Sequence, residues 1–422
     1  MAQLISKKLR HLAGLDMPGG GQVMVRDGIA YVGHMKPPHG TSIIDVSDPA
    51  NPKVIAALDV GSPWSHTHKV RVAGDLMITN VEQDRRHFIR RGERVPEVEK
   101  RLAGKLGRAP TQGETAADMG VTPEELSDMQ AAVARGYNEG GFKVWDISRP
   151  AEPRLLSYVR THGFGVHRFD MDERYAYIST EMAGYVGNIL VIYDLADPEN
   201  VEEVSRWWLP GQHIAGGETP TWKGYGHRLH HAMRVGDQLW AAVWHAGFRV
   251  IDIADIARPK TIASHNYHPW VVEPTHTILP AARPFDGRTI ALAADEEHDH
   301  RHGQPHAGLW VFDVSDLDHI TPLATFHVSE MDSPWSRAEG RFGLHQFQEH
   351  IDDDKVFCAW FAGGLRVVDI AIPEEPREDA FFMPEPRPGF ASPQTNDVDV
   401  DARGLVYLID RNSGFDILEY TA

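Results

Sequence analysis

One short pattern recurs seven times along the chain, and it limits the folds that the sequence can adopt. Each copy is an apolar run, rich in β-branched and aromatic residues, that ends in an acidic residue and in most cases leads into a turn. Such runs favour pleated strands, and Asp-Pro pairs end a strand in a turn. The copies begin at Ser42, Phe142, Leu190, Phe248, Leu309, Leu365 and Phe415.

Further strands accompany each copy. Another apolar stretch follows the turn, as in residues 54–60, and two strands joined by a tight turn precede it, as in residues 69–79. A unit of four strands, repeated about every 45 residues where nothing is inserted, is typical of one propeller blade. We therefore predict an all-β fold, a seven-bladed β-propeller that forms one domain over residues 1–422. An open β-solenoid is the alternative.

The two ends of the chain complement each other. The last copy stops after its third strand, at Tyr420, and residues 9–18 have the pattern of the missing fourth strand. A strand from the N-terminus that completes the last blade removes an exposed sheet edge. We therefore expect the N-terminal strand to close the propeller.

The repeated strand also resembles a known family, the LVIVD-repeat proteins, which are named for this motif. It stands here as Ser42-Ile-Ile-Asp-Val46, as Phe248-Arg-Val-Ile-Asp252 and as Leu365-Arg-Val-Val-Asp369. The resemblance covers nearly the whole chain and implies the propeller fold. It implies little about function, because propellers serve many roles.

The long insertions are predicted to gather on one face of the propeller. They fall between the second and third strands of a blade or between successive blades, and these loops leave a blade on the same side. Long loops on a rigid scaffold often carry function. The largest, residues 83–140, contains a helix with a capping box at Thr122 and Glu125, and we expect it to form a partly helical lid. The other insertions are residues 211–226, 297–306 and 329–341.

Histidine is the residue type that points to chemistry. The chain has 24 histidines, and five of them stand at the first residue of the innermost strand of a blade. Imidazole is the commonest protein ligand for transition metals. We therefore predict a divalent transition metal, Fe, Mn, Zn or Cu, on the propeller axis. The predicted ligands are His68, His167, His231, His276 and His345, with Asn396 and Gly21 in the remaining two blades. A ring of histidine–backbone hydrogen bonds is the structural alternative.

Further candidates stand near this column. Glu82, Glu181, His245 and Glu296 lie at the ends of second strands, where they could orient the histidines or act as general acids or bases. Solvated loop residues are the plain alternative. His66 and His230 flank the column as extra ligands or proton shuttles. The run from His298 to His302, with His306, suggests a surface lid or a weak metal site.

The predicted site resembles two other classes of propeller in its architecture. Carotenoid-cleaving oxygenases hold ferrous iron with four axial histidines backed by glutamates, and selenium-binding-type thiol oxidases carry a histidine-rich metal site. No diagnostic motif of either class stands in this sequence, and Cys358 is expected in the core rather than at a reactive site. The resemblance implies an oxidoreductase.

These observations predict a metal-dependent enzyme that acts on a small organic molecule. An oxidoreductase or oxygenase is favoured, and a non-redox lyase or hydrolase is the first alternative. The second alternative is a binding or scaffold module in which the metal is structural.

Charge and cysteine content limit the partners and the cellular compartment that we expect. The formal net charge of −18 argues against a nucleic-acid or anionic membrane partner. The single cysteine excludes an intrachain disulfide and suits a reducing compartment. The sequence shows no apolar signal-like or membrane-spanning run, so we expect a cytoplasmic protein. The oligomeric state stays open.

Overall fold

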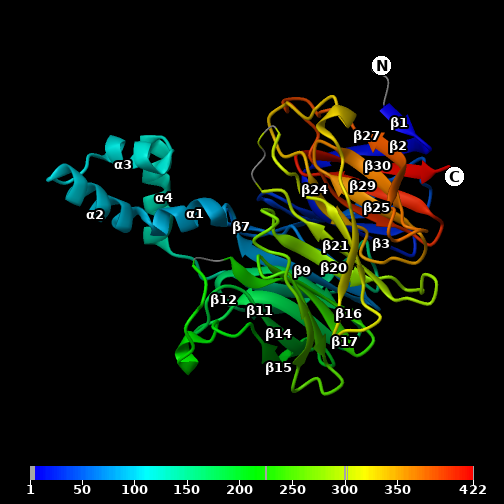
Figure 1. Cartoon of the computed structure of the whole chain (residues 1–422), viewed down its shortest axis with the longest axis horizontal. Coiled ribbons are helices and arrows are strands. Elements are labelled where there is room, and N and C mark those ends of the chain that lie inside the picture. Colours follow the sequence, from blue (N-terminus) through cyan, green and yellow to red (C-terminus); the bar gives the residue numbers. More distant parts are fainter. Residues whose placement is uncertain (1–4, 224–225, 299–300, 302, 422) are drawn as a thin grey trace.

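The structure, a computed structural model, describes residues 5–223, 226–298, 301 and 303–421. Its strands form antiparallel units of four, which Figure 1 shows gathered in one body beside a group of helices. The first blade contains β3 (Gly20–Arg26), β4 (Ile29–His34), β5 (His39–Asp45) and β6 (Lys53–Asp59). The second contains β7 (Ser65–His66) and β8 (Val70–Ala73), which both pair with β9 (Leu76–Gln83) and together form its innermost strand, followed by β10 (Gly141–Asp146) and β11 (Arg154–Arg160).

The next three blades follow the same order. The third contains β12 (His162–Met171), β13 (Tyr175–Glu181), β14 (Ile189–Asp194) and β15 (Glu202–Trp207). The fourth contains β16 (His227–Val235), β17 (Gln238–Trp244), β18 (Phe248–Asp252) and β19 (Lys260–His265). The fifth contains β20 (Thr275–Pro280), β21 (Ile290–Asp295), β22 (Leu309–Asp313) and β23 (Thr321–Phe326).

The last two blades are completed by the N-terminus. The sixth contains β24 (Leu344–Phe347), β25 (Lys355–Trp360), β26 (Gly364–Asp369) and β27 (Arg377–Met383). The seventh contains β28 (Thr395–Val400), β29 (Leu405–Asp410) and β30 (Ser413–Tyr420). The predicted closure is confirmed, because β2 (Leu9–Pro18) pairs with β30 as its fourth strand. In addition, β1 (Ile5–Lys7) pairs with β27 as a fifth strand of the sixth blade, which the sequence did not indicate.

The innermost strands close into a ring. In cyclic order β3, β8, β12, β16, β20, β24 and β28 contact one another, and β28 returns to β3. The all-β propeller prediction is confirmed, and the seven units agree with the predicted number of blades. Because each innermost strand contributes its first residues to the same end of the ring, residues far apart in sequence meet there.

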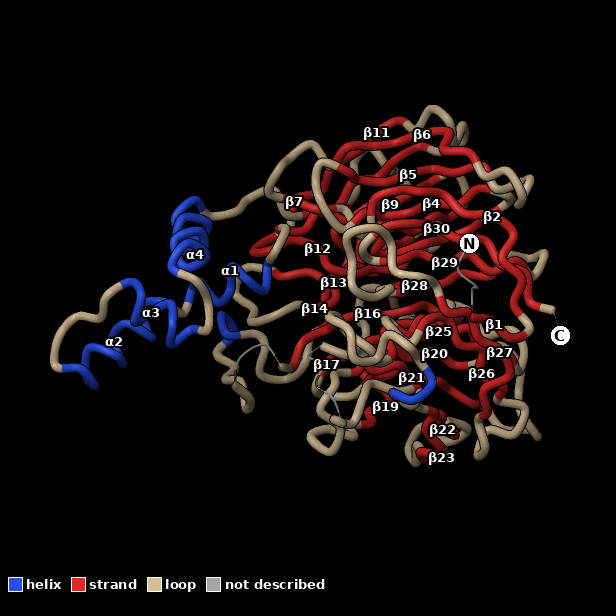
Figure 2. Tube along the Cα trace, turned by 90° about the horizontal axis from the view of Figure 1, so that it is seen from above, coloured by secondary structure: helices blue, strands red, loops and turns tan. Residues whose placement is uncertain are grey.

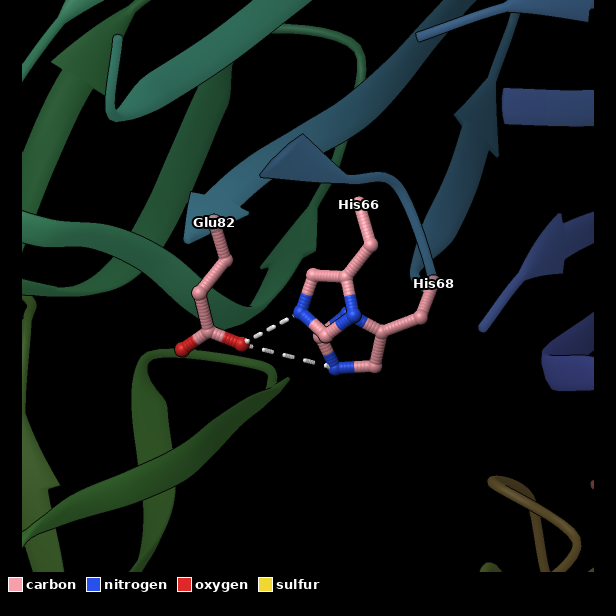
Figure 3. A group of neighbouring side chains, drawn as sticks. All are labelled: His66, His68 and Glu82. Carbon is pink, nitrogen blue, oxygen red and sulfur yellow. Dashed lines mark hydrogen bonds and ion pairs between the residues drawn. The ribbon is translucent and has the colours of Figure 1, made fainter. Parts of the chain in front are cut away.

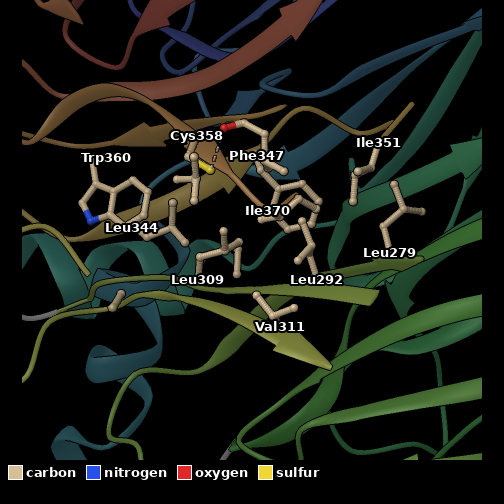
Figure 4. Packing of buried hydrophobic residues seen from close by; sticks show 14 of the residues in the cluster. Leu279, Leu292, Leu309, Val311, Leu344, Phe347, Ile351, Cys358, Trp360 and Ile370 are labelled. Carbon is tan, nitrogen blue, oxygen red and sulfur yellow. Dashed lines mark hydrogen bonds between the residues drawn. The ribbon is translucent and has the colours of Figure 1, made fainter. Parts of the chain in front are cut away.

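The core lies between neighbouring blades. Figure 4 shows this packing between the fifth and sixth blades, where Leu309 and Val311 of β22 lie close to Leu344 of β24. Trp360 and Cys358 are fully buried in the same cluster. Burial raises the pKa of the Cys358 thiol, which agrees with the expected core position.

The large insertion is more helical than predicted. It contains α1 (Arg86–Glu93), α2 (Val95–Leu106), α3 (Gln112–Met119) and α4 (Pro123–Arg135). The predicted capping box is confirmed, since Glu125 N donates to Thr122 Oγ1 at 3.1 Å and Thr122 N donates to Glu125 Oε2 at 2.8 Å. A second capping box, at Thr111 and Glu114, starts α3.

The insertion is a lid only at its beginning. Figures 1 and 2 both show α2 and α3 projecting away from the strands, so these helices do not cover the mouth. Two short 3₁₀ helices, Ile214–Gly216 and Glu330–Asp332, lie in other insertions. Among the described residues, no helix has both the length and the apolar character needed to cross a membrane.

Candidate metal centre

The innermost strands share a local irregularity, and histidines occupy it. In β24, Leu344 pairs with Trp360 and Gln346 pairs with Ala359, so His345 is an extra residue without a partner on β25. A β-bulge of this kind turns one side chain out of the regular alternation. The residues at this position, in blade order, are Gly21, His68, His167, His230, His276, His345 and Asn396.

The structure corrects the prediction in the fourth blade by one residue. His231, predicted in the column, pairs with Ala242 one step further along β16. Its Nδ1 accepts a hydrogen bond from Arg168 Nε at 3.2 Å. The bulge is longer here, because residues 228–230 stand opposite residue 243 alone, and counting by apolar alternation therefore slips. His230 takes the place predicted for His231.

Six histidine rings follow one another around this end of the ring. Their successive centroid distances are 4.3 Å from His66 to His68, 5.3 Å to His167, 4.9 Å to His230, 4.1 Å to His276 and 4.5 Å to His345. Five of these histidines line a cavity of about 640 Å³, together with both carboxylates of the site, Glu82 and Glu296, whereas His230 is fully buried beside them. The structure thus brings together four of the five predicted ligands.

The first carboxylate, Glu82, ends β9 and serves one side of the cluster. Its Oε2 lies 3.0 Å from His66 Nε2, 3.0 Å from His167 Nδ1 and 3.9 Å from His68 Nε2. Figure 3 shows His66 and His68 turned towards this oxygen. The ligand-type atoms of His66, His68 and Glu82 all lie within 4.8 Å of one another.

The second carboxylate, Glu296, follows β21 and serves the other side. Its Oε2 lies 4.0 Å from His276 Nε2, and its Oε1 lies 3.9 Å from His345 Nε2. Arg341 donates to Oε1 at 2.8 Å and fixes the carboxylate. A second group with ligand-type atoms within 4.8 Å consists of His230, His276 and Glu296.

The hydrogen bonds on Nδ1 set the tautomers of the ring histidines. His230 Nδ1 donates to the carbonyl of His276 at 2.7 Å, and His276 Nδ1 donates to Gln346 Oε1 at 2.9 Å. His345 Nδ1 donates to the carbonyl of Asn396. Together with the bond from His167 Nδ1 to Glu82, these contacts leave the lone pair on Nε2 in four histidines. Ligating histidines in proteins are oriented in this way.

His66 and His68 differ from these four. Asn80 Oδ1 accepts from the backbone N–H of Lys69, so the Asn80 amide group donates to His68 Nδ1, at 3.2 Å. The neutral His68 ring therefore carries its proton on Nε2 and donates towards Glu82. His66 contacts acceptors with both ring nitrogens, the Met35 carbonyl at 3.1 Å and Glu82. In His68, therefore, neither ring nitrogen offers a free lone pair.

Burial keeps the ring neutral. It lowers the pKa of His167 to about 3 and holds the pKa values of His230, His276 and His345 well below the ordinary range. Burial alone would raise the pKa of Glu82, but Arg86 and His167 outweigh it and hold that pKa well below the usual range. A neutral imidazole is the form that binds a metal.

The pKa of Glu296 is lowered in the same manner. Its burial is outweighed by His298, whose Nε2 lies 3.3 Å from Oε2, and by His345 and Arg341. His298 lines the main cavity, so part of the predicted histidine loop does reach the site. His306 contacts Glu297 and Glu330 instead, and His300 and His302 lie outside the described residues.

Two predicted acid–base residues point elsewhere. Glu181 accepts from Phe164 N at 3.0 Å and pairs with Arg90 of α1, because the bulge of β12 lies between its carboxylate and the ring. His245 Nε2 contacts the Val272 carbonyl at 3.2 Å. Within the described part of the chain, neither lines the main cavity. The structure therefore does not bring either residue to the histidine ring.

A tryptophan takes the place predicted for His245. Trp244 adopts the left-handed region with φ 59°, so its ring turns inwards and stacks on His230 with centroids 5.0 Å apart. It lines the main cavity. Alternation along β17 could not reveal this reversal, since a positive φ is rare outside glycine.

The sequence analysis also missed the cations at this mouth. Arg86, the first residue of α1, pairs with Glu82 and donates to His167 Nε2 at 3.3 Å. Arg341 and Arg411 line the cavity beside Glu296. The run Asp84-Arg-Arg-His87 shortly after Glu82 was the available signal, because a tight turn at residues 84–85 brings Arg86 back over the end of β9.

Comparison with known proteins supports the fold. The sequence model of the LVIVD repeat matches residues 21–60, which span β3 to β6. The chain therefore contains an LVIVD repeat and has the fold of a β-propeller. No curated protein matches it in sequence.

Solved structures resemble this propeller over nearly all of its length. The C-terminal WD40 domain of Sif2 is similar with a TM-score of 0.54 and 10% identity, over 97% of this chain and 98% of that one. A chain of the mitotic checkpoint complex has a TM-score of 0.57 and 7% identity, over 98% and 92%. The computationally designed Ika8 protein has a TM-score of 0.51 and 8% identity, over 97% and 99%. At these identities the likeness extends to the fold alone.

Proposed function

We propose that the chain is a metal-dependent enzyme that holds one divalent transition metal ion with His167, His230, His276 and His345. These ligands come from four successive blades and all have Nδ1 engaged by a protein acceptor. Compared with the set predicted from the sequence, His230 replaces His231, and His68 becomes a hydrogen-bond donor.

The contact between two of these rings carries the proposal. His167 Nε2 and His230 Nε2 lie 3.0 Å apart, yet each ring already donates its Nδ1 proton elsewhere. Two lone pairs therefore face each other in a buried place, and a cation between or beside them resolves the repulsion. Ligand nitrogens around a tetrahedral metal with bonds of 2.0–2.1 Å are roughly 3.4 Å apart, close to the distance seen.

The hydrogen bond from Arg86 bears on the same nitrogen. Because it donates to His167 Nε2, this atom must carry a lone pair. The same bond competes with a metal ion for that lone pair. Metal binding is therefore expected to move Arg86 towards Glu82 alone, with which it already forms an ion pair.

The remaining residues give the site its chemistry. An ion held by four neutral imidazoles keeps its full positive charge and would supply Lewis-acid or redox chemistry. Glu296 stays a carboxylate at neutral pH and accepts hydrogen bonds at the cavity wall. Glu82 holds the proton on His167 Nδ1, and Trp244 provides an apolar wall beside His230.

The reaction class follows from the identity of the metal. Iron or copper favours an oxidoreductase or oxygenase, the leading assignment, and zinc or manganese favours a lyase or hydrolase. The cavity of about 640 Å³ fits a small organic substrate. A scaffold role with a structural metal is the competing assignment, but a closed structural site is not expected to border a cavity of this size.

Elemental analysis of the metal-loaded protein tests the proposal. We expect one equivalent of metal in the native chain and less than a tenth of this in His276→Ala, with cooperative thermal unfolding retained. His319→Ala, an exposed histidine whose side chain is 81% accessible, is the matched control and should keep its metal. Equal metal content in the native chain and His276→Ala would reject the site.

A second measurement tests the enzyme assignment. Chains loaded with iron or copper are assayed for dioxygen consumption with small organic reductants, and chains loaded with zinc or manganese for hydrolysis of model esters. Turnover that disappears in His276→Ala and persists in His319→Ala supports an enzyme. Full metal loading without turnover in either assay would favour the scaffold.

A further inference from the structure

A smaller cavity beside the histidine site is lined entirely by basic residues. Its volume is about 220 Å³. The lining residues are Arg86, His87, Arg90, Arg91, Arg94 and Arg228. We call this cavity the arginine pocket. In a chain with a net charge of −18, five guanidinium groups around one hollow form a local exception to the overall charge.

Helix geometry accounts for the gathering. Arg86, Arg90 and Arg94 follow one another at intervals of four residues, so they lie on one face of α1 and its C-terminal cap. Arg91 stands beside them on the neighbouring row. The opposite face is apolar, since Ile89 is buried against the insertion and the strands. The helix thus docks with one face and presents its arginines with the other.

The strand below supplies the fifth arginine. Arg228 of β16 is only 7% exposed, and its guanidinium lies over the Trp244 ring at 4.3 Å from the centroid. Burial and the guanidinium groups of Arg86 and Arg90 lower the pKa of Arg228 to about 9. Like charges brought together at a buried place destabilise it, and an anion bound among them offsets this.

Some of these arginines have fixed positions. Arg86 pairs with Glu82, Arg90 pairs with Glu181, and Arg91 donates to the Met119 carbonyl. Each guanidinium carries five N–H donors in a planar fork, so one such bond orients the group and leaves donors for a ligand. The pocket is therefore organised before an anion enters, which favours binding.

The arginine pocket adjoins the histidine site. Arg86 and His87 line both cavities. Trp244 lies beneath Arg228 and also stacks on His230, so one side chain separates the pocket from a proposed ligand. A molecule held by one end in the arginine pocket therefore has its other end beside the ring of histidines.

We infer that the arginine pocket binds the oxyanion group, carboxylate or phosphate, of a small molecule. Guanidinium forks match both groups with paired hydrogen bonds. A volume of about 220 Å³ admits a headgroup and leaves the rest of the molecule to the larger cavity. Anion binding itself needs no metal, whereas the role of this anion as the substrate's anchor rests on the proposed function.

Calorimetric titration of the metal-free full chain tests the inference. Inorganic phosphate and succinate are the two probes, and saturable binding of either one is expected, stronger at low than at high ionic strength. The double variant Arg91→Gln/Arg94→Gln removes two exposed guanidinium groups and should weaken binding by about tenfold or more. Arg228→Gln should weaken it at least as much.

A control variant tests whether a change in net charge alone weakens binding. Arg101→Gln removes one charge from α2, where Arg101 pairs with Asp118 away from the pocket, and should bind the probe as the native chain does. Because Arg228 is buried, the result for Arg228→Gln is used only if this variant unfolds cooperatively. If it does not, the exposed double variant decides alone. Stronger binding of phosphate or of succinate identifies which oxyanion the pocket prefers.

Two results would overturn the inference. One is the absence of saturable binding of both probes to the native chain, and the other is equal binding by the native chain and the double variant. Metal content is measured on the same preparations. Metal loading without anion binding rejects only this inference, and anion binding without metal loading rejects only the proposed function.

Discussion

Two layers of side chains lie one residue apart along the innermost strands, and they differ in how their polar atoms are paired. In the histidine layer, the Nε2 lone pairs of His167 and His230 face each other. In the next layer, Arg168 pairs with Glu349 and donates to His231. The second layer contains Gln22, Lys69, Arg168, His231, Thr277, Gln346 and Asp397, all of them buried. We propose that the first layer binds a metal ion and that the second holds the blades together.

The β-bulge decides which of the two layers a residue belongs to. His230 and His231 are neighbours in sequence and both are fully buried, but the bulge in β16 places them in different layers. Glu349 links residues of the second layer, because Arg168 and Gln346 of that layer, together with Arg71, all donate to it. A residue's function here is set by its layer more than by its type.

The largest expected effect concerns Glu349. Glu349→Gln leaves the guanidinium groups of Arg71 and Arg168 buried without their common carboxylate, so we expect the free energy of unfolding to fall by about 3–5 kcal/mol. Urea denaturation measures this. The matched control is Glu375→Gln, which breaks an exposed ion pair with Arg377 and should change stability by less than about 1 kcal/mol. Equal effects in the two variants would contradict a structural role for the second layer.

The histidine layer predicts that acid destabilises the metal-free protein. The pKa of His167 is lowered to about 3, and those of His230, His276 and His345 are also lowered by burial. A histidine with a lower pKa in the folded chain gains its proton on unfolding. Stability is therefore full above about pH 6.5 and falls as the pH drops towards the folded pKa.

Each such histidine contributes up to about 1.4 kcal/mol per pH unit in this window. Urea denaturation of chelator-treated protein at about pH 7 and about pH 5 measures the slope. The variant His345→Gln should show a shallower slope than the native chain. A native chain whose stability does not change over this range would contradict a neutral, buried ring.

The smallest expected effect concerns the insertion. Thr122→Ala removes the side-chain cap of α4, so we expect a local loss of about 1 kcal/mol. Hydrogen exchange of residues 123–135 should become faster, while metal content stays unchanged because none of the described residues of α2 to α4 lines the cavity at the histidine ring. Loss of metal in this variant would show that the helices close the site.

More of the fold than of the candidate site could be predicted from the sequence. The repeated strand and the incomplete last blade predicted the propeller and its closure by β2, because alternation and pairing follow directly from residue type. The helices α1 to α3 were not predicted, since basic residues dominate the face of α1. The column of His68, His167, His276 and His345 was readable because a histidine recurs at the start of the innermost strand in most blades.

The errors in the site have physical causes. Because the bulge of β16 is longer than the others, His230 occupies the position predicted for His231. The length of a bulge cannot be predicted from residue type. The direction of Glu181 depends on Arg90, which comes from a helix far away in sequence. The tautomer of His68 depends on Asn80, and a tautomer follows only from hydrogen bonds in three dimensions.

The most direct test compares His230→Gln with His231→Gln. Both residues are fully buried and adjacent on β16, so the two variants change the same chemistry one residue apart. Metal titration of each purified variant, with cooperative unfolding as the check on folding, gives the affinity. We expect a loss of about a hundredfold or more in His230→Gln and a change of less than about threefold in His231→Gln. Metal affinity that survives in His230→Gln, or that is lost only in His231→Gln, would contradict the proposed site.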